Sequence, residues 1–238
     1  MAGETPDDVT IARYKQEAAR YAVRAIQPGM IVGLGHGTTA AQAMQQLADL
    51  LRAGALHDIL GVPCSRHVEA SAQALGIPLT TLDEHPVVDL TIDGADEVDP
   101  ELNLIKGGGG ALLREKIVAQ ASRREIIIVD ETKLTPVLGT RAALPVVVTP
   151  FGWRSQAIYL ESLGARWKMR ADAAGNPFLT DERHYILDCR FGPLTAPDGL
   201  ALQLQSRAGI AAHGLFLGVT REVVVGGADG VRELHPHR

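Results

Sequence analysis

The chain has 238 residues, of which 46% are hydrophobic and 21% charged, and its net charge is -5. This composition is typical of a globular protein with one domain, or with one large and one small domain. Scattered basic residues on an acidic chain argue against nucleic acid and against an anionic membrane as partners. No apolar run approaches the roughly 20 residues that a membrane-spanning helix needs.

The two cysteines, Cys64 and Cys189, lie far apart, and neither has a spacing typical of a zinc site or a redox pair. Residues 1–8 carry acidic side chains and lack the apolar core of a secretory signal. We therefore expect a cytoplasmic protein with reduced thiols and no metal site.

The first half of the chain alternates between helical and strand patterns. Apolar residues at helical spacing predict a helix over residues 10–26, which Pro28-Gly29 ends. Further helices are expected at 40–51, 65–75 and 111–122, and strands at 30–34, 57–62, 79–82, 87–93 and 125–130. Continuous apolar strands between helices are typical of parallel sheets. We predict an α/β fold, with an open, mostly parallel, Rossmann-like sheet that has helices on both faces.

After Thr132 the pattern changes, because Pro136, Pro145 and Pro150 interrupt it. The sequence predicts a helix at 154–163 and shorter strands at 166–169, 178–180 and 184–189, which suggests an antiparallel arrangement. Strands expected at 213–219 and 222–225 would return the chain to the first sheet. We predict an α/β catalytic domain over 1–131 and 207–238, and a smaller α+β subdomain over 132–206.

A glycine-rich loop, Gly33-Leu34-Gly35-His36-Gly37-Thr38-Thr39, separates the first strand from the second helix. Glycines bring backbone N–H groups close to a ligand, the helix N-terminus adds partial positive charge, and the threonines supply hydroxyls. The loop therefore suits a phosphate. A dinucleotide site is disfavoured, because the third glycine comes one position early and the next strand offers no acidic residue for a ribose. A plain turn without a ligand is the remaining alternative.

An acidic segment follows the strand expected at 87–93. Four acids, Asp93, Asp96, Glu97 and Asp99, fall within seven residues. Ligands of open α/β sheets bind outside the carboxyl ends of the strands, which is where Asp93 and Asp96 are expected. Such carboxylates suit a hydroxyl-rich substrate. The segment lacks the residues of a calcium-binding EF-hand loop, and a solvated acidic turn is the alternative.

A third segment joins Lys106 to Glu115 through the four glycines 107–110. Four glycines are entropically costly to order, so a closely approached ligand would explain them better than a flexible linker. Glu115 lies one turn into the expected helix. A half-buried carboxylate there has a raised pKa and suits a general base, while a lysine opposite it stabilises an oxyanion. Alternatively, Arg114 and Lys116 pair with Glu115 on a solvated face.

Taken together, these segments resemble type A ribose-5-phosphate isomerases, and the resemblance extends over nearly the whole chain. Its most specific parts are Asp93-Gly94-Ala95-Asp96-Glu97 and Lys106-Gly107-Gly108-Gly109-Gly110. The resemblance implies interconversion of ribose 5-phosphate and ribulose 5-phosphate through an enediolate, with no metal or cofactor, by a homodimer or higher homo-oligomer. It implies that Glu115 is the base, that Lys106 steadies the oxyanion, that Asp93 serves ring opening and hydroxyl proton transfer, and that Asp96 binds sugar hydroxyls.

The same resemblance implies the phosphate and backbone contacts. The expected binding residues are Lys15, Gly35, Gly37, Thr38, Thr39, Gly107, Gly108, Gly109 and Lys133. One departure is local, because this chain has His36-Gly37-Thr38-Thr39 where the family often has Thr-Gly-Ser-Thr. His36 adds bulk and a titratable group near the substrate.

Two other functions are alternatives to the isomerase. A sugar-phosphate deaminase or lactonase would share the phosphate loop, but the segment from Lys106 to Glu115 argues against it. A catalytically silent sugar-phosphate sensor normally carries a DNA-binding or partner domain, and no basic recognition helix is present. A sensor would bind ribose 5-phosphate tightly without turnover.

Overall fold

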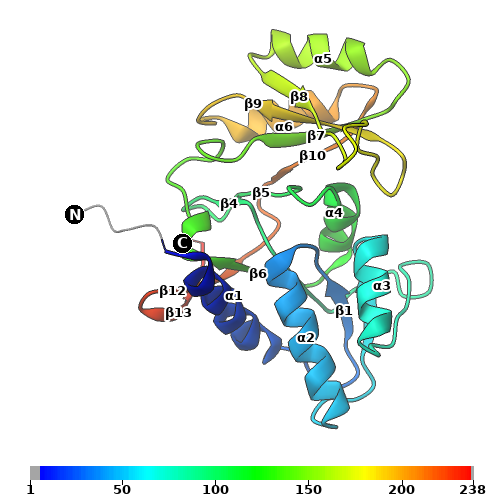
Figure 1. Ribbon diagram of the computed structural model, residues 1–238, viewed down its shortest axis with the longest axis vertical. Coiled ribbons are helices and arrows are strands. Elements are labelled where there is room, and N and C mark those ends of the chain that lie inside the picture. The colour runs from blue at the N-terminus through cyan, green and yellow to red at the C-terminus, as the bar shows by residue number, and fades with distance from the viewer. Residues whose placement is uncertain (1–5, 237–238) are drawn as a thin grey trace.

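The computed structural model describes residues 6–236 (Figure 1). Residues 1–5 of the N-terminal stretch and residues 237–238 of the expected α/β domain lie outside the described range. No helix within the described range is long and apolar enough to cross a membrane.

The main sheet has six strands in the order β13-β12-β6-β3-β1-β2. Five of them pair in parallel, namely β1 (Ile31–Leu34), β2 (Leu60–Pro63), β3 (Leu90–Asp93), β6 (Glu125–Asp130) and β12 (Glu222–Gly227). The edge strand β13 (Gly230–Leu234) is antiparallel to β12. This confirms the mostly parallel α/β sheet. The strand order reverses between β1 and β3, and at such a point an open α/β sheet leaves a crevice at its carboxyl edge.

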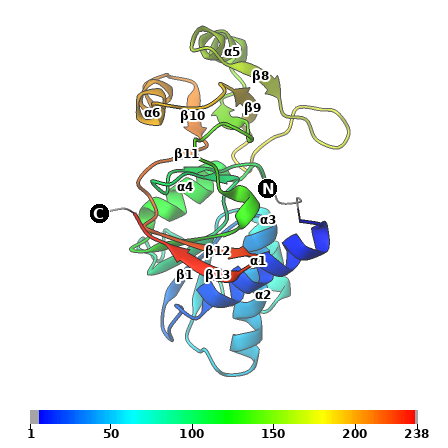
Figure 2. The ribbon, with the colours of Figure 1, turned by 90° about the vertical axis from the view of Figure 1, so that its left-hand side faces the viewer.

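Both faces of the main sheet are covered, which explains the unbroken apolar run of β6. Ile126 and Ile128 belong to the core cluster that includes residues of α1 (Asp8–Val23) and α2 (Thr38–Arg52). Ile127 and Val129 face the opposite way, because alternate strand residues point to opposite faces, and pack with Ala119 of α4 (Leu112–Ala121). Figure 2 shows α1 and α4 on either side of β12 and β13. One more helix, α3 (Arg66–Ala74), packs against the main sheet, where it contacts β2.

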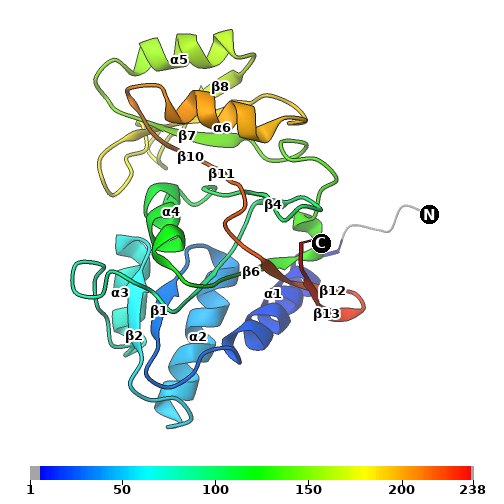
Figure 3. The same ribbon diagram turned by 180° about the vertical axis from the view of Figure 1, so that it is seen from behind.

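A second, antiparallel sheet lies beyond α4 and has the strand order β10-β7-β9-β8 (Figure 3). Its strands are β7 (Leu144–Val148), β8 (Arg166–Met169), β9 (Tyr185–Arg190) and β10 (Ile210–His213). Helices α5 (Trp153–Ser162) and α6 (Pro197–Gln205) pack on one face. The other face meets Leu112, the first residue of α4. This sheet and its helices form the smaller α+β part that the sequence predicts.

Three two-residue strands, β4 (Glu97–Val98), β5 (Leu104–Ile105) and β11 (Leu215–Phe216), form a small sheet between the two larger ones. They pair antiparallel around the central β5. Pairing of β4 with β5 folds the chain back on itself, so the segments before β4 and after β5 lie side by side. Those segments carry Asp96 and Lys106.

Two predicted strands are wrong. In residues 79–82 only Leu79 forms a β-bridge, with Gly61. The chain turns just beyond it, because Thr81 accepts hydrogen bonds from the backbone N–H groups of Glu84 and His85. In 178–180 the only neighbouring bridge is Ala171 with Pro177. Each segment makes too few backbone hydrogen bonds to a neighbour to continue as a strand.

Pro145 was expected to interrupt the chain, but it lies inside β7 opposite Asp188. A proline removes only its own N–H, and the Pro145 carbonyl still accepts from Gly214 N–H at 2.8 Å. The strand expected at 213–219 is also divided, since Ile210–His213 pairs with β7 and Leu215–Phe216 pairs with β5. Residues 210–213 therefore belong to the smaller sheet and not to the α/β part, where we expected them. Helix α6 and strands β7 and β13 were not predicted.

Candidate active site

A cleft opens at the carboxyl edge of the main sheet, where β1 and β3 end. Its empty volume is about 490 Å³, open mouth included. The loops after β1 and β3 form part of its wall, and the glycine run after Lys106 closes it on another side. All of the site residues predicted from the sequence line this cleft except Gly35 and Asp93, which lie behind its wall.

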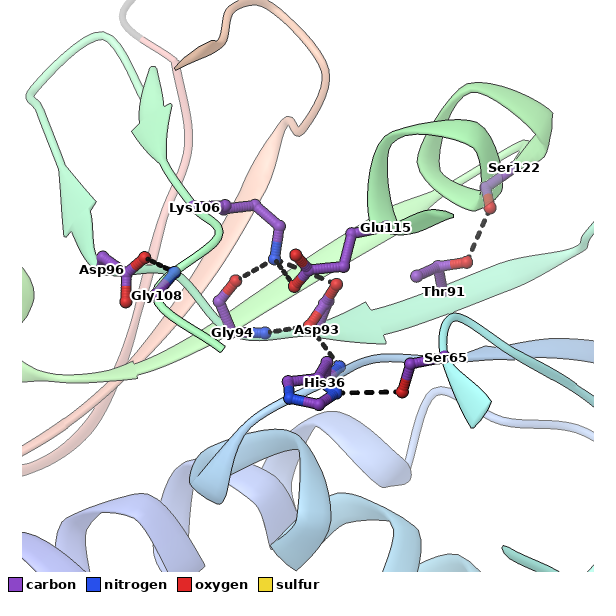
Figure 4. Close-up of polar contacts among 10 residues, drawn as sticks. All are labelled: His36, Ser65, Thr91, Asp93, Gly94, Asp96, Lys106, Gly108, Glu115 and Ser122. Atoms are coloured by element: carbon purple, nitrogen blue, oxygen red, sulfur yellow. Dashed lines mark hydrogen bonds and ion pairs between the residues drawn. The ribbon is translucent and has the colours of Figure 1, made fainter. Parts of the chain in front are cut away.

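A buried lysine between two carboxylates forms the floor of the cleft (Figure 4). Lys106 Nζ lies 3.0 Å from Asp93 Oδ2 and 3.0 Å from Glu115 Oε1, and it also donates to the carbonyl oxygen of Gly94. The three side chains are almost fully buried, with at most 5% of each residue exposed. Ionic groups are buried in this way only when they are paired.

Burial also sets the proton affinities in this cluster. It raises the pKa of Glu115 to about 8, against the opposing charge of Lys106. Burial by itself lowers the pKa of Lys106, but the charges of Asp93 and Glu115 outweigh it and raise that pKa above the ordinary lysine value. The lysine therefore stays protonated while the carboxyl of Glu115 gains or loses a proton near neutral pH. This combination suits a general base beside a fixed cation.

Glu115 does not pair with its sequence neighbours, so the alternative of a solvated ion-pair face is wrong. Arg114 pairs with Glu182, with Nε 2.5 Å from Oε1. Lys116 Nζ donates to the carbonyls of His213 at 2.6 Å and Leu215 at 2.8 Å. Both neighbours are therefore occupied elsewhere, and Glu115 faces the cleft.

Asp93 is held by backbone N–H donors from the loop after β1 and the loop after β3. Its Oδ1 accepts from His36 N–H at 3.0 Å and from Gly94 N–H at 2.7 Å. The loop after β1 approaches closely because Gly35 has no side chain, and a Cβ there would lie 2.5 Å from the Cα of Asp93. Gly35 is thus a packing requirement for the site rather than part of the cleft surface.

The glycine run is ordered, so the flexible-linker alternative is wrong. Gly108 N–H donates to Asp96 Oδ2 at 2.8 Å, and Gly107 has a φ of +107°, which favours glycine. The carbonyls of Gly107 and Gly108 accept from Arg170 Nη1 at 2.8 and 3.1 Å. The same guanidinium binds both carboxylate oxygens of Asp188. Sequence reasoning missed Arg170, because the two glycine carbonyls that it binds are more than 60 residues away and no local motif marks it.

The other two acids of the segment after β3 have structural partners. Glu97 accepts from the backbone N–H groups of Gly139, Arg141 and Ala142 at 2.6, 2.5 and 2.6 Å, so it holds a distant loop. Asp99 accepts from the N–H groups of two residues just beyond it. Only Asp93 and Asp96 are therefore close to the cleft.

Cationic and hydroxyl groups gather at the end of the cleft next to α2. Lys15 Nζ, on α1, donates to Thr38 Oγ1 at 3.1 Å, and Thr38 is the first residue of α2. Lys133 of the short 3₁₀ helix η1 (Glu131–Lys133) lines the same cleft, as does Thr39. Two ammonium groups, two hydroxyls and a helix N-terminus form a strong anion site, and a phosphate suits it.

The described residues contain no cluster of three or more His, Cys, Asp or Glu side chains that could hold a metal ion.

The residues that line the cleft offer two distinct chemistries. One end carries the acid–base set around Lys106, and the other carries the anion site around Thr38.

Comparisons with known proteins agree on one family. The model of the family described as ribose 5-phosphate isomerase A (phosphoriboisomerase A) matches residues 60–230. The chain is 57% identical over 220 residues to ribose-5-phosphate isomerase A of Chloroflexus aurantiacus, covering 92% of each chain. The solved ribose 5-phosphate isomerase of Plasmodium falciparum superposes with a TM-score of 0.92 at 37% identity, over 95% of this chain and 100% of that one. A solved D-ribose-5-phosphate isomerase in complex with phospho-erythronic acid has the same TM-score, 0.92, at 34% identity, over 94% of this chain and 99% of that chain.

Proposed function

The chain belongs to the ribose 5-phosphate isomerase A family, and we propose that it performs the family reaction in this cleft, with Glu115 as the base and Lys106 as the oxyanion partner. The enzyme interconverts ribose 5-phosphate and ribulose 5-phosphate. The observation that carries the assignment of roles is the buried Lys106 between Asp93 and Glu115, in a cleft whose other end is cationic.

The proposed reaction begins with the open-chain aldehyde. Lys15, Lys133 and the hydroxyls of Thr38 and Thr39 bind the phosphate, which places the first two carbons near Glu115. The Glu115 carboxylate removes the proton from the second carbon, and the electron pair of that C–H bond forms the carbon–carbon double bond of an enediolate. Negative charge then develops on the oxygen of the first carbon, where the Lys106 ammonium stabilises it.

The second half-reaction protonates the first carbon, after the Glu115 carboxyl has exchanged its proton with solvent. Glu115, now protonated, gives its proton to the first carbon while the double bond closes to a carbonyl at the second. The proton of the second hydroxyl is transferred to the oxygen of the first carbon, so atoms and charges balance. Asp96 lines the cleft and would accept from sugar hydroxyls. Asp93 lies behind Lys106 and positions its ammonium, and a further part for Asp93 in ring opening stays a prediction.

The test is incubation of metal-stripped protein with ribose 5-phosphate in heavy water, followed by NMR. Proton transfer through an enediolate predicts ribulose 5-phosphate with deuterium at its first carbon and, on return, ribose 5-phosphate with deuterium at its second. Product that retains only the substrate's own hydrogen would contradict a solvent-exchanging base. Binding without product would favour the sensor instead.

We further propose that the protein is a homodimer or higher homo-oligomer, and that the smaller part, residues 132–213, contributes the contacts. Large apolar side chains are exposed on its helices, with Ile158 of α5 at 67% and Leu202 of α6 at 68%. Such exposure is common at assembly surfaces. Light scattering after gel filtration tests this, since a monomer in solution would contradict it.

A cytoplasmic location is also proposed. Cys64 and Cys189 are buried and unpaired, as is usual where thiols are kept reduced. Fractionation of cells with an antibody against the chain is the direct measurement.

A further inference from the structure

His36 lies between the two ends of the cleft. Its backbone N–H donates to Asp93 Oδ1 at 3.0 Å, on the side of the acid–base set. The next residue, Gly37, precedes α2 and the anion site. The His36 ring lines the cleft itself (Figure 4). No role for this ring follows from the acid–base set or from the anion site.

The ring orientation is fixed from several sides. Nδ1 lies 3.0 Å from Ser65 Oγ, and the His67 ring packs edge-on with its centroid 5.6 Å away. The opposite edge of the ring lies against Gly109, where a Cβ would stand 2.4 Å from Cδ2 and 2.6 Å from Nε2 of His36. Gly109 therefore makes room for the histidine, and a larger residue there would push it out of the cleft.

Ser65 favours one of the two tautomers of the His36 ring, because the Ser65 hydroxyl hydrogen needs an acceptor. Its Oγ already accepts from Val68 N–H at 3.0 Å as the cap of α3. Among residues 6–236 the only other hydrogen-bond partner of this hydroxyl is His36 Nδ1, so its single hydrogen is directed to that nitrogen. Nδ1 is then the acceptor, and Nε2 carries the ring hydrogen.

The lowered pKa of His36 favours the neutral imidazole. Burial lowers the pKa of His36, against the opposing charge of Asp93, while His67 and Lys106 lower it further and Asp181 raises it. Nε2–H has no hydrogen-bond partner within the described part of the chain. The cleft therefore contains a neutral, oriented donor without a partner, at a point between the acid–base set and the anion site.

We propose that His36 is a substrate-binding residue that donates Nε2–H to an oxygen in the middle of the pentose chain, on its third or fourth carbon. This inference rests on the proposed function, which places the phosphate near Thr38 and the first two carbons near Glu115. The chain between those ends passes His36, and its hydroxyls are the acceptors available there. A neutral donor selects a hydroxyl without competing with the lysines for the phosphate.

The experiment compares ribose 5-phosphate with its 3-deoxy and 4-deoxy analogues in the wild type and in His36→Phe. The variant keeps a ring of similar size and removes the donor. For each protein, the preference is the kcat/KM for ribose 5-phosphate divided by the kcat/KM for the analogue. For one of the two analogues, we expect this preference to be roughly tenfold higher in the wild type than in His36→Phe, which is the scale of one hydrogen bond. Differences in ring opening between the sugars are the same for both proteins, so they cancel in this ratio.

His67→Phe is the matched control, because His67 packs on His36 but does not line the cleft. Its preference should equal that of the wild type. An unchanged preference in His36→Phe for both analogues would overturn the proposal, whereas absence of turnover in the wild type would instead overturn the proposed function.

A second readout does not depend on turnover. NMR of ¹⁵N-labelled histidine should show the His36 ring neutral, with its hydrogen on Nε2. A ring with its hydrogen on Nδ1, or a ring protonated at neutral pH, would contradict the orientation argued from Ser65. This measurement stays decisive if His36→Phe folds poorly.

Discussion

Lys106, Asp93 and Glu115 form a buried set in which each residue has a separate part. Lys106 supplies a cation that holds its proton, Asp93 fixes that cation at 3.0 Å, and Glu115 supplies the carboxyl that titrates near neutral pH. Sequence reasoning identified these residues from the motif and the expected burial of Glu115. The distances between them required the fold, because Asp93 ends β3 while Lys106 follows β5.

The pH profile should report the Glu115 carboxyl. Below its pKa this group is protonated and takes no proton from the substrate, so kcat/KM should rise with pH up to about 8. Substrate phosphate ionises near pH 6, and the measurement therefore runs from about pH 6.5 upward. A flat profile between about pH 6.5 and 8 would contradict a base whose pKa is raised by burial.

Replacing Lys133 by alanine should weaken phosphate binding equally in the ground state and the transition state. We expect KM to rise roughly tenfold, the scale of a hydrogen bond to a charged group, with little change in kcat. Lys168→Ala is the control, because Lys168 is an exposed lysine on β8 that does not line the cleft. Equal KM values in the two variants would remove Lys133 from the site.

At the scale of elements, long apolar strands were predictable and short ones were not. Periodicity identified β6 at its observed bounds and placed β12 in the first sheet. The two-residue strands β4 and β5 have no period to detect, and β11 was expected only as part of a longer strand at 213–219. Pro145 misled the prediction of β7, since a proline costs one donor and a strand held by both neighbours tolerates it.

In the candidate site too, local features were predictable from the sequence and contacts between distant residues were not. Local motifs identified most of the residues that line the cleft, because glycine runs and carboxylates after a strand have a physical meaning in sequence, whereas Lys15 and Lys133 were implied only by the family resemblance. Ser65 and Arg170 could not be identified, because each acts on a residue far away in the chain. In the acidic segment, only Asp93 and Asp96 were expected in the site, and Glu97 holds the loop at 139–142 instead.

Gly35→Ala tests the close approach of the loop after β1 to β3. The added Cβ would lie 2.3 Å from Asp93 Oδ1 and 2.5 Å from its Cα, so the backbone must shift. We expect a loss of roughly 1–3 kcal/mol in unfolding free energy, typical of overpacking, together with a loss of activity. Gly199→Ala in α6 is the control, since its Cβ meets nothing within 4 Å. Urea unfolding compares the two, and equal stability would refute the packing requirement at Gly35.

For the molecule as a whole, the cleft depends on both layers. Helix α4 begins against the smaller sheet at Leu112, carries Glu115, and packs on the main sheet at Ala119. Arg170 reaches from the end of β8 to the carbonyls of Gly107 and Gly108. The smaller part therefore positions the glycine run, whatever its share in assembly.

Arg170→Ala should disturb that run without touching the acid–base set. We expect kcat to fall between roughly tenfold and a hundredfold, the cost of misplacing a catalytic loop by about an ångström. Arg170→Lys should restore little, because a lysine lacks the planar fork that binds Asp188 and the carbonyls together. Arg166→Ala is the control, because Arg166 is exposed and begins β8, the strand that precedes Arg170. Wild-type kcat in Arg170→Ala would show that the contact is dispensable.

The most direct test of the central claim is Glu115→Gln, assayed for turnover and for deuterium exchange in heavy water. The amide keeps the shape of the side chain but cannot carry the proton, so both rates should fall by roughly a hundredfold or more. Binding of ribose 5-phosphate should persist and show that the cleft is intact. Undiminished exchange at the second carbon in this variant would contradict Glu115 as the base.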